Sequence, residues 1–295
     1  MFCNGSTAVA STSEMPFLVA VKKGGIYSFE EGEWLLQYPL SQEIYKLFPL
    51  GPYIFGIGDY GTIIRYHTFS KKWTRSAFPT TQRLWDICGH EGGLIVTHGG
   101  SKLYISQNFG SNWTIARPFK AVSNPPLIRS LFYHNGDIYI GTQVHREYGG
   151  LWKYSLSSQT LTLIKKEYQS MISAIYIDTD RRLIITKGTA FSSRGSVEML
   201  LPDQPAWIVM NQPITERAFL DLFTSENQLF TTSSKDEYGY SRIYQLHFDQ
   251  KKLVPIETVS GHSFRGAGHK DQLFIAGSDE SKWIDSLNKK PVYLH

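Results

Sequence analysis

Residues 106–113, Ser-Gln-Asn-Phe-Gly-Ser-Asn-Trp, form the stretch that first indicates the fold. A short hydrophobic run, residues 102–105, leads into this segment, which is rich in the turn residues Ser, Asn and Gly. A second run begins at Trp113 and continues with the β-branched Thr114. Two such runs joined by a short segment that contains Gly predict a β-hairpin.

The pattern of this hairpin recurs along the chain. The residues that begin the last strand of each repeat stand at positions 34, 73, 113, 161, 207, 253 and 292, at intervals of 39, 40, 48, 46, 46 and 39 residues. Periods of about 40 to 50 residues with four strand-like runs each are typical of β-propellers, because each small sheet can bury its faces only against its neighbours. The sequence therefore predicts an all-β fold, a single seven-bladed β-propeller of four-stranded antiparallel blades over residues 1–295.

The two ends of the chain are harder to assign. Residues 7–12 occupy the place of the innermost strand of the first blade, but their side chains are small and only weakly apolar. An edge strand and a different closure of the ring are therefore alternatives, and we expect a frayed N-terminus over residues 1–15. Residues 290–294 would supply the outermost strand of the seventh blade.

The composition excludes several classes of protein. Aromatic residues make up 14% of the chain, and 30 basic residues against 26 acidic ones give a net charge of +4. This excess is too small to indicate nucleic-acid or membrane binding, although it permits an anionic partner. Without a run of about 18 apolar residues or a signal peptide, and with Cys3 and Cys88 expected to be unpaired, we expect a cytoplasmic monomer.

The spacing Ser-x-Asn-x-Gly-x-x-Trp at residues 106–113 resembles the Asp-box of sialidase-type (BNR) β-propellers, with Asn108 where that family usually has Asp. The resemblance implies that Ser106, Asn108, Gly110 and Trp113 stabilise their own turn, away from any active site. Sialidases bind a carboxylate with three Arg, the first in a Phe/Tyr-Arg-Ile-Pro motif near the start, but this chain lacks the motif and its first Arg is Arg65. Relatives without catalytic residues include photosystem II assembly factors, so the resemblance implies a non-catalytic member.

Other motifs for chemistry are missing from the sequence. Residues 56–61 match G-x-G-x-x-G, but the next segment reads as a strand, whereas a dinucleotide site needs a helix there. The His and Cys residues show no metal-ligand spacing, and no G-x-S-x-G nucleophile elbow occurs. We therefore expect no cofactor, no metal and no catalytic residues.

The candidate binding residues lie on one face of the expected ring. The loops between the second and third strands lengthen in three consecutive blades, at residues 143–149, 188–194 and 233–240. Because rigid sheets commonly present function on their longer loops, these loops and the nearby strand starts are the expected contact surface. Its candidate residues are Arg146, Tyr148, Arg194, Tyr238 and Tyr240, with Arg129 and Arg217 nearer the axis.

Four Arg stand at or near the start of an innermost strand on this face: Arg83, Arg129, Arg217 and Arg265. Such Arg would present forked donors to carboxylates or phosphates at the mouth of the channel. Alternatively, they pair locally with Glu43, Asp86, Glu216 and Asp221 and have only a structural role.

These observations favour a non-enzymatic binding scaffold that recognises a protein partner with an acidic or anionic surface. A glycan-binding protein is an alternative, since Tyr148, Tyr238, Tyr240 and Trp85 offer rings for stacking on sugars. A glycoside hydrolase or lyase is a further alternative; it would need two paired carboxylates, and the sequence pairs none.

Overall fold

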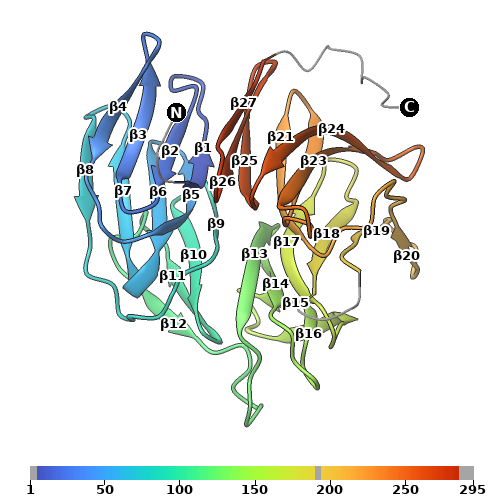
Figure 1. Ribbon diagram of the computed structural model, residues 1–295. Coiled ribbons are helices and arrows are strands. Elements are labelled where there is room, and N and C mark those ends of the chain that lie inside the picture. The colour runs from blue at the N-terminus through green and yellow to red at the C-terminus, as the bar shows by residue number, and fades with distance from the viewer. Residues whose placement is uncertain (1–4, 190–193, 286–295) are drawn as a thin grey trace.

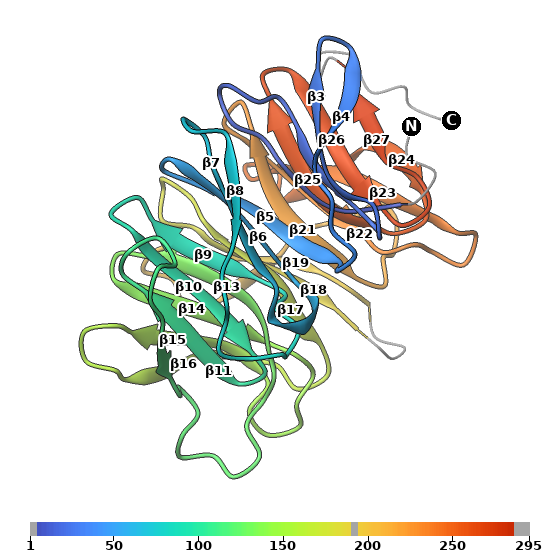
Figure 2. The same cartoon turned by 90° about the vertical axis from the view of Figure 1, so that its left-hand side faces the viewer.

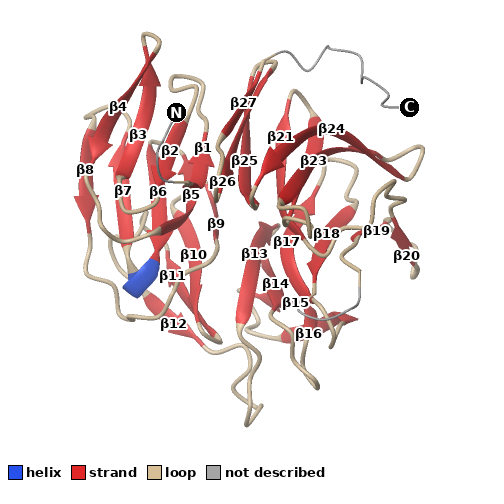
Figure 3. Ribbon diagram, viewed as in Figure 1, coloured by secondary structure: helices blue, strands red, loops and turns tan. Residues whose placement is uncertain are grey.

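The chain folds as a ring of small sheets in the computed structural model, which describes residues 5–189 and 194–285 (Figure 1). These residues form 27 strands in seven antiparallel sheets and one short 3-10 helix, η1 (Asp59–Gly61), shown in blue in Figure 3. No helix in these two ranges has the length and apolar character of a bilayer span. The predicted seven-bladed, all-β architecture is confirmed.

Each blade is a continuous stretch of chain whose strands pair in sequence order. Blades 1 to 3 contain β1 (Ser6–Ala10), β2 (Leu18–Val21), β3 (Gly25–Glu30) and β4 (Glu33–Tyr38); β5 (Ile44–Leu50), β6 (Tyr53–Gly58), β7 (Ile63–His67) and β8 (Lys72–Arg75); and β9 (Ile87–His90), β10 (Leu94–Gly99), β11 (Lys102–Ser106) and β12 (Thr114–Ala116).

The remaining blades follow the same order. Blades 4 to 7 contain β13 (Ile128–His134), β14 (Asp137–Thr142), β15 (Gly150–Ser155) and β16 (Leu161–Lys166); β17 (Met171–Ile177), β18 (Leu183–Gly188), β19 (Val197–Leu200) and β20 (Trp207–Val209); β21 (Phe219–Ser225), β22 (Gln228–Ser233), β23 (Tyr240–His247) and β24 (Lys252–Ser260); and β25 (Ser263–His269), β26 (Gln272–Gly277) and β27 (Lys282–Ile284).

The ring closes between blade 7 and the N-terminal strand. The innermost strands contact one another in order around the ring, and β25 and β26 in turn contact β1. Ser6 Oγ lies 2.6 Å from Ser281 Oγ and accepts a hydrogen bond from the Gly277 amide at 3.2 Å. This approach is so close that a Cβ at Gly5 would lie 2.0 Å from the Ser278 carbonyl oxygen, which explains the small residues here.

The fraying expected over residues 1–15 therefore does not extend to Ser6–Ala10, which form a fully buried innermost strand. The expected outermost strand of blade 7, residues 290–294, lies outside the described residues. In blade 3 the innermost strand begins at Ile87 instead of Leu84, although Leu84 is buried in the interface with blade 2.

The hydrophobic core lies between the blades, which pack face to face (Figure 2). Within the described ranges the buried apolar residues form seven clusters, and each cluster joins two neighbouring blades. The cluster around Val9, Phe17 and Phe274 joins blade 1 to blade 7, and rings such as Phe17 and Trp283 contact edge to face with centroids 4.9 Å apart. Closure thus rests on the same burial of apolar surface as every other interface.

The turn between β11 and β12 is held by the side chains that the sequence singled out. Ser106 Oγ accepts the Gly110 amide at 2.8 Å, and Asn108 Oδ1 accepts the Asn112 amide at 2.9 Å. Gly110 has φ 79°, a conformation that favours glycine. Trp113 packs between blades 2 and 3, where its ring meets Phe78 at 5.0 Å in a T-shaped contact.

We predict that Trp113→Ala lowers the free energy of unfolding by about 2 kcal/mol, since a partly buried ring leaves the interface between two blades. Asn108→Ala should cost about 1 kcal/mol because the turn loses the hydrogen bonds to Asn108 Oδ1. Chemical denaturation measures both effects. A Trp113→Ala protein that is as stable as the parent but no longer binds a partner would show that the turn is a contact site.

Candidate functional site

The first face of the ring carries the loops between the second and third strands of each blade and the starts of the innermost strands. In blades 4 and 6 these loops cover residues 143–149 and 234–239, whereas residues 190–193 of the expected blade 5 loop lie outside the described residues. Blades 4, 5 and 6 are consecutive around the ring.

The loop of blade 6 has a fixed backbone and an exposed aromatic side chain. Asp236 Oδ1 accepts the amides of Tyr238 at 2.9 Å and Tyr240 at 3.0 Å, while Asp236 Oδ2 pairs with Arg242 at 2.7 Å. Arg242 also pairs with the buried Glu216 at 3.2 Å. On this rigid support the side chain of Tyr238 is 77% exposed and that of Tyr240 is 48% exposed.

The loop of blade 4 is held in a similar way. His145 Nδ1 accepts the Tyr148 amide at 3.0 Å, and the Tyr148 carbonyl accepts the indole N–H of Trp152 at 3.0 Å. Tyr148 is half-buried against His145, with ring centroids 5.7 Å apart, whereas Arg146 is exposed. The backbone on which Arg146 stands is thus ordered before any partner binds.

Arg194 and Arg217 lie at the loop of blade 5 and at the start of blade 6, and both are exposed. Within residues 5–189 and 194–285, no ion pair joins either of them to a carboxylate. Their charge is available to a partner.

The innermost strands share a backbone irregularity at this face. The pairing register shifts, as in a β-bulge, at the second residue of β1, β5, β13, β21 and β25 and at the third residue of β17. The residues at the shifts are Thr7, Tyr45, Arg129, Ser173, Leu220 and Phe264, and Trp85 stands at the equivalent place just before β9. Bulges re-aim side chains and often occur beside functional sites.

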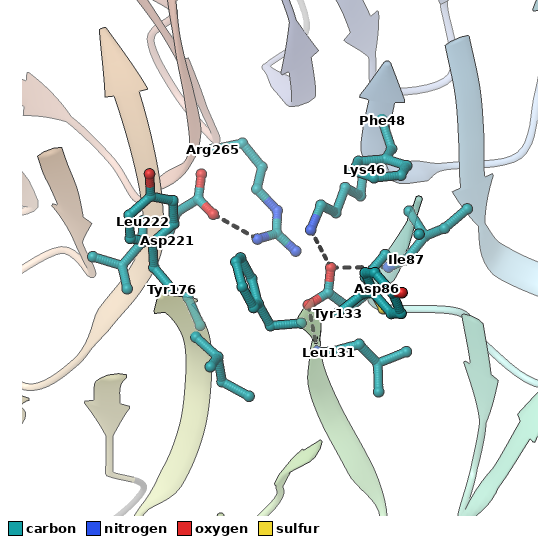
Figure 4. A pocket seen from close by; sticks show the side chains of 15 residues that line it. Lys46, Phe48, Asp86, Ile87, Leu131, Tyr133, Tyr176, Asp221, Leu222 and Arg265 are labelled. Atoms are coloured by element: carbon teal, nitrogen blue, oxygen red, sulfur yellow. Dashed lines mark hydrogen bonds and ion pairs between the residues drawn. The ribbon is translucent and has the colours of Figure 1, made fainter. Parts of the chain in front are cut away.

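Below this level, charged side chains from four blades cross the channel. Figure 4 shows the guanidinium of Arg265 and the ammonium of Lys46 lying between the carboxylates of Asp221 and Asp86. Arg265 Nη1 donates to Asp221 at 2.8 Å, and Lys46 donates to Asp86. The residues enclose a cavity of about 210 Å³, whose other walls include Phe48, Phe132 and Tyr176.

Both channel carboxylates have all their oxygens occupied. Besides Lys46, Asp86 accepts the amides of Ile87 at 2.9 Å and Leu131 at 2.7 Å. Burial opposes ionisation of Asp86, but the charges of Lys46 and Arg265 and these donors hold its pKa below the ordinary value. Such a carboxylate is an ionised structural group.

Arg265 also fastens the aromatic residues above it. Its Nε donates to the Tyr45 carbonyl at 3.2 Å, and its Nη2 donates to the Trp85 carbonyl at 3.1 Å. One side chain of blade 7 thereby joins blade 2, blade 6 and the segment that leads into blade 3. Among the two sequence-based interpretations of Arg265, local pairing is the one that the geometry supports.

Arg83 and Arg129 lie at the channel mouth on the aromatic rings. Arg83 donates from Nε to Asp59 at 2.6 Å, and its guanidinium lies 4.8 Å from the centroid of Trp85. The guanidinium of Arg129 lies 4.3 Å from the same ring. Tyr45 completes the group, with its ring centroid 4.7 Å from that of Trp85 and its hydroxyl donating to Asp59 at 2.8 Å.

Arg129 differs from Arg83 and Arg265 in lacking a carboxylate. It forms no ion pair within the described parts of the chain, and its buried Nη1 has no hydrogen-bond partner there. Burial, reinforced by the nearby charge of Arg265, lowers the pKa of Arg129 to about 10, so it remains a cation at neutral pH.

The structure thus brings Arg83, Arg129 and Trp85 together at the channel mouth and places Arg265 beneath them. Tyr45, Asp59, Lys46 and His98 also belong to this region, although the sequence did not single them out. In the alignment of the innermost strands, Tyr45 takes the same position as Trp85 and Arg129, and this shared position is the one signal in the sequence that could have indicated Tyr45.

The sequence matches no family model. Over 288 residues it is 36% identical to "Uncharacterized protein YkuO" of Bacillus subtilis (strain 168), an alignment that covers 96% of this chain and 97% of that protein.

Solved structures share the fold at low sequence identity. The extracellular domain of BT4673 from B. thetaiotaomicron matches with a TM-score of 0.73 at 14% identity over 96% of this chain, which spans only 38% of that domain. YCF48 from Cyanidioschyzon merolae matches with a TM-score of 0.70 at 13% identity over 95% of each chain. The RRP9 WD40 repeats match with a TM-score of 0.70 at 10% identity over 98% of this chain and 91% of theirs.

Proposed function

From a chain that belongs to the family of Bacillus subtilis YkuO and folds as a seven-bladed β-propeller, we infer a binding protein that recognises an acidic protein partner through its first face. Propellers commonly present a rigid face of loops to another molecule, although fold alone does not fix the ligand. We propose that the protein is a monomer. We also propose a cytoplasmic location, because the free, buried Cys88 suits a reducing compartment. From the resemblance of residues 106–113 to the Asp-box of sialidase-type propellers, we propose that this turn is a structural variant of that box.

The observation that carries this proposal is the combination of rigid loops and exposed side chains on three consecutive blades. Tyr238 is largely exposed on a loop whose backbone is already held by Asp236. Aromatic residues that are ordered before binding lose little conformational entropy on contact, so Tyr is frequent among the residues that dominate binding energy. The exposed Arg146, Arg194 and Arg217 supply positive charge around it.

The proposal is tested by using the immobilised chain to capture partners from an extract of its native host and then measuring the affinity of the purified partner. We predict that Tyr238→Ala weakens binding about tenfold, the loss expected for a binding hot spot. Arg194→Ala with Arg217→Ala should weaken it about fivefold and reduce its dependence on salt, because exposed charges at an interface act mainly on association.

A matched control is available on the opposite face. Lys71 and Lys251 lie in exposed turns between third and fourth strands, with φ of 54° and 51°, a region that Asn tolerates. Lys71→Asn with Lys251→Asn should leave both affinity and salt dependence unchanged. If this control weakens binding while the first-face variants do not, the binding face has been wrongly assigned. If the chain binds to a glycan array and captures no protein, the result would favour the glycan-binding alternative.

A further inference from the structure

The mouth cluster, which comprises Tyr45, Arg83, Trp85 and Arg129, has an unbalanced charge. Around it, three carboxylates are each matched by one cation: Asp59 by Arg83, Asp86 by Lys46 and Asp221 by Arg265. The nearby Glu43 also has a cation, because its Oε1 lies 3.7 Å from Lys22 Nζ. Arg129 is the cation that remains when these pairs are counted within the described ranges.

An unmatched guanidinium in this position is costly to the free protein. Arg129 is half-buried, one of its terminal nitrogens is fully shielded, and that nitrogen has no hydrogen-bond partner among the described residues. Removing a charged group from water without giving it a partner costs free energy, so buried polar atoms are nearly always satisfied by protein, water or ligand. Trp85 offers the face of its ring, but a cation–π contact satisfies none of the N–H donors.

A second buried group nearby also lacks partners. His98, on β10, is fully buried, and neither of its ring nitrogens forms a hydrogen bond within the described parts of the chain. It lies close enough to Arg129 and Asp86 for their charges to act on its pKa. Blades 3 and 4 thus each contribute a buried polar side chain with unsatisfied nitrogens, and such atoms are usually satisfied by water or a ligand.

The aromatic residues of the cluster are held in position from below. Arg265 donates to the carbonyls of Tyr45 and Trp85, so both backbones are fixed relative to the channel. Arg83 is fixed by Asp59 and lies 4.8 Å from the Trp85 ring. A group that enters the mouth would thus meet a rigid wall and a forked donor that is already in place, the arrangement that favours planar anions.

We propose that the mouth cluster is a binding site for an oxyanionic group, a carboxylate or a phosphate, with Arg129 as its principal donor and Arg83 and Trp85 beside it. This inference rests on the proposed function where the group is an acidic side chain or the terminal carboxylate of the protein partner. A free small anion presents the same chemistry.

The site is tested first with small anions. We expect 50 mM sodium phosphate or sodium acetate to raise the melting temperature of the parent above its value in sodium chloride of equal ionic strength, since a ligand that binds only the folded state stabilises it. The indole N–H signal of Trp85, assigned with Trp85→Phe, should shift in the same titrations. Arg129→Gln should abolish both effects, whereas Lys71→Asn, in an exposed turn on the opposite face, should retain them.

The melting temperature of the free variants gives an independent readout. Because Arg129 is an unmatched cation, Arg129→Leu should raise the melting temperature in chloride by about 2 °C while it removes the response to phosphate. If Arg129 had only a structural role, Arg129→Leu would instead lower the melting temperature. Arg83→Leu serves as the matched comparison. This substitution leaves Asp59 without its cation and should therefore lower the melting temperature in chloride.

The partner assay separates the sources of the anion. If Arg129→Gln loses both the phosphate response and partner affinity, the site takes a carboxylate of the partner; if it loses only the phosphate response, the site takes a free anion. If the parent responds to neither anion and Arg129→Gln binds the partner normally, the inference is overturned. Loss of affinity in Tyr238→Ala would then still support the proposed function.

Discussion

Arg265→Leu is expected to lower the free energy of unfolding by about 3 to 5 kcal/mol, because it leaves Asp221 buried without its cation. The substitution also removes the donors to the Tyr45 and Trp85 carbonyls, and with them the link from blade 7 across the channel to blades 2 and 3. Chemical denaturation at neutral pH measures the effect.

Two further variants decide whether the buried charge is the cause. Replacing both members of the pair, Arg265→Leu with Asp221→Leu, should recover part of the loss, since a buried ion pair exchanged for apolar side chains is often nearly neutral. Arg217→Leu, at the exposed start of the neighbouring blade, should change stability by less than about 0.5 kcal/mol. A double variant less stable than Arg265→Leu alone would contradict this explanation.

The second large effect concerns acid. Burial lowers the pKa of His98 to about 3 from an ordinary value of 6.5, so the imidazole is neutral in the folded chain at every pH above that value. Between pH 6.5 and about 3 the unfolded chain therefore binds a proton that the folded chain does not. By linkage, the stability that neutral His98 contributes is fully present above pH 6.5 and falls on acidification, by up to about 1.4 kcal/mol per pH unit.

We expect the parent to lose about 2 kcal/mol more stability between pH 7 and pH 5 than His98→Leu loses over the same interval. The charges that act on His98 come from Asp86, Arg129 and Lys46. The pKa of Asp86 is held below its ordinary value and that of Arg129 is about 10, so neither of these two groups produces the difference. Equal pH dependence in the parent and His98→Leu would show that His98 is not buried as described.

The repeat period was sufficient to predict the ring because seven similar hairpins repeat a local pattern of apolar and turn residues. Residues 7–12, the expected first innermost strand, were ambiguous for a physical reason. The strand observed there, Ser6–Ala10, has small side chains that fit a close contact with blade 7, whose residues are some 270 positions away along the chain. Sequence patterns report local periodicity, whereas the closure of a ring joins its two ends.

The site was less predictable because its decisive contacts are also distant in sequence. Arg83, Arg129 and Arg265 look alike in the sequence, yet Asp59 pairs with Arg83 and Asp221 with Arg265. Arg129 has no carboxylate partner within residues 5–189 and 194–285. The register shifts that bring Tyr45 and Arg129 to the same level leave no mark in the residue types. Nothing in the residues around His98 indicates that its buried ring nitrogens have no hydrogen-bond partner in the described part of the chain.

Hydrogen–deuterium exchange of the chain, alone and with its captured partner, shows directly whether the first face binds that partner. Binding through the first face should slow exchange in residues 143–149 and 234–239 and at the start of β13, and leave the turns between β7 and β8 and between β11 and β12 unchanged. Slower exchange confined to those turns would contradict binding through the first face.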